Sequence, residues 1–130
     1  MPSPTTTAAR LSSVMPYSVT TELHTRTYIS GPMTGYPGLN LPAFAAAADT
    51  LRALGHEPVN PGENTLGPDP QWADYLRVDL SDLVTCSAVA LLPGWHESKG
   101  ALLEIHVAKE LGLAVHPIER WVELGARVAA

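Results

Sequence analysis

One carboxylate occupies an unexpected position in the segment ALLEIHVAKELG, residues 101–112. The segment has the spacing of an amphipathic helix, whose apolar side is formed by Ala101, Val107, Ala108 and Leu111. Glu104 lies in the middle of that side. A carboxylate at such a position is either a structural group that a neighbour holds by hydrogen bonds, or a reactive group that is fixed in place and shielded from water.

Three residues at the start of the same helix have the chemistry of an anion site. Ser98, Lys99 and Gly100 offer a hydroxyl, an ammonium and the unpaired N–H groups of a helix N-terminus, which together suit a phosphate. Spacing alone favours a simpler interpretation, in which Ser98 only caps the helix.

The other candidate groups give weaker signals. Asp79 lies on the preceding predicted helix, at residues 70–87, where aspartates are most often solvated. It is a candidate because that helix leads into the strand before Ser98 and is expected to run beside the same ligand site. The loop SGPMTG, residues 30–35, is neither a Walker A loop nor GxGxxG. The histidines and the single cysteine, Cys86, lack zinc-site spacing, so we expect no metal and no cofactor.

The elements that must position these residues alternate between strands and helices. Short apolar runs predict strands at residues 26–30, 56–61, 88–92 and 113–118. Helical patterns cover residues 41–55, 70–87, 100–111 and 119–130, with Asn40, Asp69 and Ser98 as expected N-caps. This order predicts an α/β fold, a small Rossmann-like (flavodoxin-like) open parallel sheet of four to five strands flanked by helices.

Length and composition suit one domain of this kind. The chain has 130 residues, of which 45% are hydrophobic, enough for a single core. We expect residues 1–25, which are rich in Ser, Thr and Pro, to be a disordered extension, and residues 26–130 to form the α/β domain.

Charge and hydropathy exclude two classes of partner. The formal net charge of −5 argues against a nucleic-acid polymer or an anionic membrane. No apolar run approaches the ~20 residues of a membrane span. The N-terminal segment also lacks the apolar core of a signal peptide, so we expect a cytoplasmic protein.

Two loops are expected to meet where such sheets bind ligands, beyond the carboxyl ends of the strands. One is residues 30–35, after the first strand, and the other is PGWHESKG, residues 93–100, after the third. Glu104 lies one turn into the helix that follows the second loop. The sequence therefore predicts that Glu104 points toward a ligand crevice.

Several stretches together resemble the nucleoside 2-deoxyribosyltransferase superfamily, and most closely a small, often phage-borne branch of it. They are TYISGPMTG at 27–35, LPAFAAAADTLRALGHEPVNP at 41–61, a helical Asp-Leu before the third strand, and SKGALLEIHVAKELGLAV at 98–115. The likeness covers about residues 26–118.

The resemblance implies a chemistry and assigns residues to it. In the family, a glutamate attacks C1′ of a nucleoside or nucleotide, the base leaves, and water or a second base then takes the sugar from the glycosyl-enzyme ester. The motifs place the glutamate at Glu104, the aspartate that assists departure of the base at Asp79, and the first-strand tyrosine at Tyr28. We expect the substrate pocket to be lined by Ser30, Gly31, Met33 and Trp95.

The residues just before Glu104 indicate one branch of the family. Transferases that act on free nucleosides carry Asp-x-Gly-Thr there, whereas residues 97–100 are Glu-Ser-Lys-Gly. They look more like the Ser-x-Gly of the 2′-deoxynucleoside 5′-monophosphate N-hydrolases, which holds the phosphate. The phosphate is therefore expected at Ser98, Lys99 and Gly100, with Thr34 and Gly35 closing the cradle. Two departures are Glu97, whose charge opposes a phosphate, and Cys86-Ser87, where many relatives have Ala-Asp.

Three functions compete on these grounds. The first is an N-glycosidase that cleaves a (2′-deoxy)nucleoside 5′-monophosphate through an intermediate on Glu104. The second is a nucleoside 2-deoxyribosyltransferase that exchanges bases, and the third is a nucleotide-binding module without catalysis, which would not need Glu104 on an apolar face. Because family members complete the pocket from a neighbouring subunit, the resemblance also implies a homodimer or larger homo-oligomer, with the helices at 42–54 and 74–84 as candidate contacts.

Overall fold

The computed structural model describes residues 25–129. The extension expected at residues 1–25 therefore lies outside the described residues, except for Thr25. Strands and helices alternate in the predicted order, as β1 (Arg26–Ser30), α2 (Leu41–Ala53), β2 (Glu57–Val59), α3 (Trp72–Leu83), β3 (Ala88–Leu91), α4 (Lys99–Glu110), β4 (Ala114–Pro117) and α5 (Ile118–Ala129). Three short 3-10 helices, η2 (Pro37–Asn40), η3 (Pro61–Glu63) and η4 (Trp95–Glu97), occupy connecting loops.

The four strands form one parallel sheet in the order β2-β1-β3-β4. Tyr28 of β1 pairs with Val59 on one side and with Val89 on the other. The predicted fold class is confirmed. The chain moves from β1 outward to β2 and then crosses to β3, so the order of strands reverses between β1 and β3. Open sheets of this type bind ligands beyond the carboxyl ends of the two strands at such a reversal.

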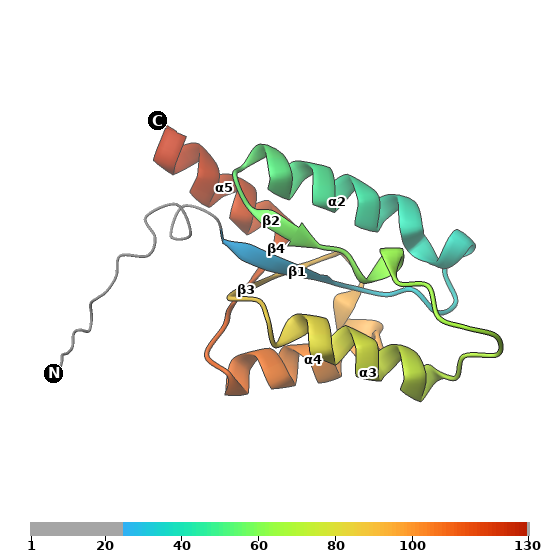
Figure 1. Ribbon diagram of the computed structural model, residues 1–130. Coiled ribbons are helices and arrows are strands. Elements are labelled where there is room, and N and C mark those ends of the chain that lie inside the picture. The colour runs from blue at the N-terminus through green and yellow to red at the C-terminus, as the bar shows by residue number, and fades with distance from the viewer. Residues whose placement is uncertain (1–24, 130) are drawn as a thin grey trace, which may run out of the picture.

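Helices cover both faces of the sheet, α2 and α5 on one and α3 and α4 on the other (Figure 1). Side chains of successive residues in β1 alternate between these layers, as the pleat requires. Tyr28 packs in a core cluster with Leu83 of α3 and Ile105 of α4, whereas Ile29 packs with Phe44 and Leu51 of α2. Ser30 is two residues beyond Tyr28 and therefore faces α3 and α4 as well.

The two loops beyond β1 and β3 lie against each other, as predicted. A Cβ atom added to Gly31 would come 2.7 Å from Cβ of Leu92, and one added to Gly94 would come 2.5 Å from Oη of Tyr36. Gly94 also has a φ of 87°, which glycine adopts without strain. Both glycines thus allow a close approach of the loops that follow β1 and β3.

Of the predicted N-caps, Asn40 stands at the predicted position before α2 but does not cap the helix with its side chain, whereas Asp69 is wrong because Gln71 precedes α3. Asn40 has a φ of 62°, and its Nδ2 donates a hydrogen bond to the carbonyl oxygen of Pro32 (2.9 Å) instead of accepting from the first turn of α2. Helix α3 begins two residues later than expected, where Asp74 accepts a hydrogen bond from the backbone N–H of Gln71 (2.8 Å). Asp69 has a φ of 51° and belongs to the turn before that helix.

Candidate functional site

Glu104 lies on the buried face of α4. The buried residues of the helix are Ala101, Glu104, Ile105 and Ala108, which follow the i, i+3, i+4, i+7 spacing of one face. Glu104 itself is only 6% exposed. Leu111 was expected on this face but is 52% exposed, because the helix ends at Glu110 and the chain turns there through Gly112 toward β4.

Two hydroxyl groups of β1 hold the Glu104 carboxylate. Tyr28 Oη donates to Oε2 at 2.7 Å, and Ser30 Oγ donates to Oε1 at 2.6 Å. Both donors are buried, and their i, i+2 spacing places them on the sheet face that α4 covers. Each carboxylate oxygen therefore has one donor, at the carboxyl end of β1 next to the switch in strand order.

Burial raises the pKa of Glu104 to about 7, and the hydrogen bonds from Ser30 and Tyr28 oppose this effect by favouring the ionised form. The negative charge of Asp79 raises the pKa of Glu104 further. Burial, together with the charge of Glu104, also raises the pKa of Tyr28 far above its ordinary value. Tyr28 therefore stays protonated and remains a hydrogen-bond donor at any physiological pH.

Asp79 reaches the same region from α3. Its charge influences both Glu104 and Tyr28, and its own pKa is raised to about 6 by burial, against a hydrogen bond from Asn64. Asn64 Nδ2 lies 3.1 Å from Asp79 Oδ1 and 3.2 Å from Asp82 Oδ2. Asn64 was not predicted from the sequence, where its place in the loop after the second predicted strand is the one signal for it.

The start of α4 is capped by Ser98, whose Oγ accepts a hydrogen bond from the N–H of Ala101 (3.1 Å). This contact leaves the hydroxyl hydrogen of Ser98 available. Within residues 25–129, the backbone N–H groups of Lys99 and Gly100 have no acceptor. Among residues 25–129, no atom outside the helix's own backbone and the chain neighbours would lie within 4 Å of a Cβ added to Gly100, so the space beside this residue is open.

The remaining predicted residues lie in different surroundings. The Lys99 ammonium lies 4.6 Å from the ring centre of Trp72, so its charge is directed toward α3. Trp95 packs against the cluster that contains Tyr28, whereas Met33 packs against the cluster on the α2 side of the sheet. Thr34 and Gly35 are exposed, and no hydrogen bond within the described residues joins them to α4. Glu97 is exposed as well.

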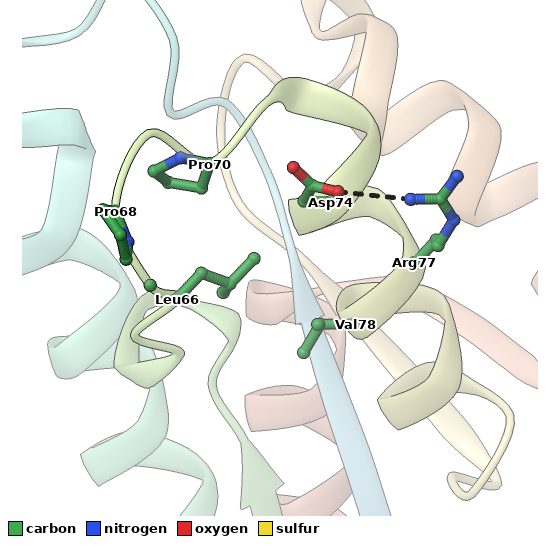
Figure 2. A pocket seen from close by; sticks show the side chains of 7 residues that line it. Leu66, Pro68, Pro70, Asp74, Arg77 and Val78 are labelled. Carbon is green, nitrogen blue, oxygen red and sulfur yellow. Dashed lines mark hydrogen bonds and ion pairs between the residues drawn. The ribbon is translucent and has the colours of Figure 1, made fainter.

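A hollow of about 380 Å³ lies away from these groups, between the loop that follows η3 and the first turns of α3 (Figure 2). It is lined by Leu66, Gly67, Pro68, Pro70, Asp74, Arg77 and Val78. Figure 2 shows the ion pair between Asp74 and Arg77 on the α3 side of the hollow (3.2 Å). Neither Glu104 nor Ser98 lines it, so this hollow does not belong to the candidate site.

Residues 25–129 contain neither a cluster of metal ligands nor a helix that could span a membrane. Between residues 25 and 129, no group of three or more His, Cys, Asp or Glu side chains is arranged so that it could hold a metal ion. In the same part of the chain, no helix is long and apolar enough to cross a membrane.

The raised pKa of Glu104 makes the stability of the fold depend on pH. Between about pH 4.5 and 7 the folded protein keeps a proton that the unfolded chain releases, so the free energy of unfolding falls as pH rises. Gln at position 104 cannot ionise. The free energy of unfolding of Glu104→Gln, relative to that of the wild type, should therefore rise by up to about 3 kcal/mol between pH 4.5 and pH 8. Urea unfolding at both pH values measures this.

Glu110→Gln is the matched control, since it removes a carboxylate from an exposed position of the same helix. A difference between wild type and Glu104→Gln that is the same at pH 4.5 and pH 8 would show that burial does not perturb Glu104.

The comparisons with known proteins agree with this geometry at the level of the fold. No curated protein matches the chain. Among solved structures, a 2-deoxyribosyltransferase from the psychrotolerant bacterium Bacillus psychrosaccharolyticus is similar, with a TM-score of 0.55 and 21% identity over 69% of each chain. The resemblance inferred from the sequence is thus supported as a likeness in fold. Residues 25–117 match the family described as "Domain of unknown function (DUF4406)", and the chain belongs to that family.

Proposed function

We propose that this protein is an N-glycosidase that cleaves the base from a (2′-deoxy)nucleoside 5′-monophosphate through a glycosyl-enzyme intermediate on Glu104. The observation that carries the proposal is the buried Glu104 carboxylate, held by Tyr28 and Ser30 at the carboxyl end of β1. A nucleophilic carboxylate must be fixed and shielded from bulk water, and this one is both. The fold shared with a 2-deoxyribosyltransferase supports a reaction at a nucleoside glycosidic bond.

The reaction proceeds in two steps. In the first, an oxygen of ionised Glu104 attacks C1′, the bond from C1′ to the base breaks, and its electron pair leaves with the base. Asp79 donates a proton or a hydrogen bond to that leaving group, a contribution typically worth ~10²–10⁴-fold. In the second step, water attacks C1′, the ester bond from C1′ to Glu104 breaks, and the water gives a proton to Asp79 or to solvent, which releases the sugar phosphate and regenerates the carboxylate.

The start of α4 is the proposed site of the 5′-phosphate. The N–H groups of Lys99 and Gly100, which have no acceptor within residues 25–129, the Ser98 hydroxyl and the partial positive charge of the helix N-terminus all favour an anion. Glu104 follows Gly100 by four residues, about 6 Å along the helix axis, which is comparable with the separation of a 5′-phosphate from C1′. Lys99 contributes its backbone rather than its ammonium, which packs on Trp72.

Base exchange between free nucleosides is the second candidate, which the likeness in fold to a 2-deoxyribosyltransferase favours. Base exchange differs from hydrolysis in two ways. Its substrate needs no phosphate, and a second base, instead of water, takes the sugar from Glu104. In either case we propose a homodimer or larger assembly, whose neighbouring subunit completes the pocket.

Removal of the Glu104 nucleophile should abolish catalysis without unfolding the protein. Gln has the shape of Glu, and the hydroxyls of Tyr28 and Ser30 can accept as well as donate, so Glu104→Gln should fold. Incubation with a panel of nucleoside monophosphates, followed by chromatography of the released base, should show turnover for wild type and Glu110→Gln. It should show none for Glu104→Gln. Release of base by Glu104→Gln at the wild-type rate would refute the mechanism.

The phosphate site separates hydrolysis of nucleotides from base exchange. Ser98→Asp keeps an acceptor for the N–H of Ala101, so α4 stays capped, but places a negative charge where the phosphate would bind. Wild type should cleave monophosphates far better than the matching nucleosides, with inorganic phosphate as a competitor. Ser98→Asp should lose at least tenfold in kcat/KM on monophosphates only. Equal wild-type rates on both substrates would favour the transferase.

A further inference from the structure

The side chain of Asn64 connects two carboxylates that lie one turn apart on α3. Its Nδ2 is 3.1 Å from Asp79 Oδ1 and 3.2 Å from Asp82 Oδ2. An amide nitrogen carries two hydrogens and accepts none, so it can donate to both carboxylates at once. We propose that Asn64 is a positioning residue, whose amide bridges Asp79 and Asp82 and thereby fixes which oxygen of Asp79 faces the candidate site.

Asn64 is itself held in place by the turn that carries it. Its backbone N–H donates to the carbonyl oxygen of Pro61 (3.1 Å), which closes η3. The same turn is capped by Asn60, whose Oδ1 accepts from the N–H of Gly62 (2.8 Å). Pro61 is buried. The amide of Asn64 is therefore presented from an anchored turn beyond the carboxyl end of β2.

The direction of these hydrogen bonds determines where Asp79 holds a proton. Because Nδ2 can only donate, Oδ1 of Asp79 must accept, whether the carboxyl is ionised or neutral. A proton on Asp79 therefore resides on Oδ2, the oxygen that Asn64 leaves free. A group that is to donate a proton to a leaving base needs its acidic oxygen directed in this way.

The bridge also offsets repulsion among the acidic groups. Asp79 lies near Asp82 on its own helix, Glu104 on α4 and the neutral phenol of Tyr28 on β1. Burial and the charge of Asp82 both disfavour the ionised form of Asp79, and the N–H of Asn64 is the contact that favours it. Loss of the bridge should therefore shift the titration of Asp79 upward.

A pair of isosteric substitutions in the same turn tests this inference. Asn64→Asp replaces the bridging donor by an acceptor, whereas Asn60→Asp adds the same charge to η3 but keeps the oxygen that caps Gly62. Carboxyl carbon NMR of the full chain, with Asp79 assigned from Asp79→Asn, follows the titration directly. We expect the midpoint of Asp79 to rise by at least one pH unit in Asn64→Asp and by less than half a unit in Asn60→Asp. Equal shifts in the two variants would overturn the inference.

The kinetic part of the test rests on the proposed function, and the NMR part does not. Asn64→Ala should lower kcat with little change in KM, and should move the pH optimum upward. In an Asp79→Asn background it should cause no further loss, because Asn64 acts through Asp79. An additive loss in that background would contradict a positioning role. If neither the wild type nor any variant releases base, but the NMR shift is observed, the proposed function is wrong and the positioning role of Asn64 is still supported.

Discussion

The structure is organised around the burial of one carboxylate. Moving an ionised carboxyl out of water is costly unless donors replace the lost hydration, and Glu104 meets two donors, one for each oxygen. Both come from alternate residues of β1, so the pleat of a single strand sets the geometry. Removal of either hydroxyl would leave an oxygen of Glu104 without its donor, although the apolar residues Ala101, Ile105 and Ala108 would still pack α4 against the sheet.

The surrounding fold supplies what that contact requires. Residues Thr27 to Ser30 are fully buried because β1 is central in the sheet and covered on both faces. The strand order reverses between β1 and β3, and Ser30 lies at the carboxyl end of β1, where sheets of this type bind ligands. The N-terminus of helix α4 has a partial positive charge, and the same helix carries the buried Glu104 carboxylate. Helix α3 adds Asp79 from the same face of the sheet.

Much of this arrangement could be predicted from the sequence, because it depends on periodicity. The alternation of strands and helices predicts the sheet, and the helical spacing identifies Glu104 as a carboxylate on an apolar face. Contacts that depend on side-chain direction in loops could not be predicted. Asn64 looks like any loop asparagine, Asn40 looks like a helix cap although it bonds back to Pro32, and Met33 lies on the opposite side of the sheet from Glu104. The packing of Lys99 of α4 on Trp72 of α3 could not be predicted either, because the two residues lie far apart in the sequence and no local pattern links them.

The central claim is that Glu104 bonds covalently to the sugar during turnover. Acid quench of the protein during steady-state cleavage of a nucleoside monophosphate, followed by mass spectrometry of its peptides, tests this most directly. The peptide containing Glu104 should gain the mass of the sugar phosphate, and the same peptide of Glu104→Gln should not. Release of base with no such adduct, under conditions in which the ester survives the quench, would contradict it.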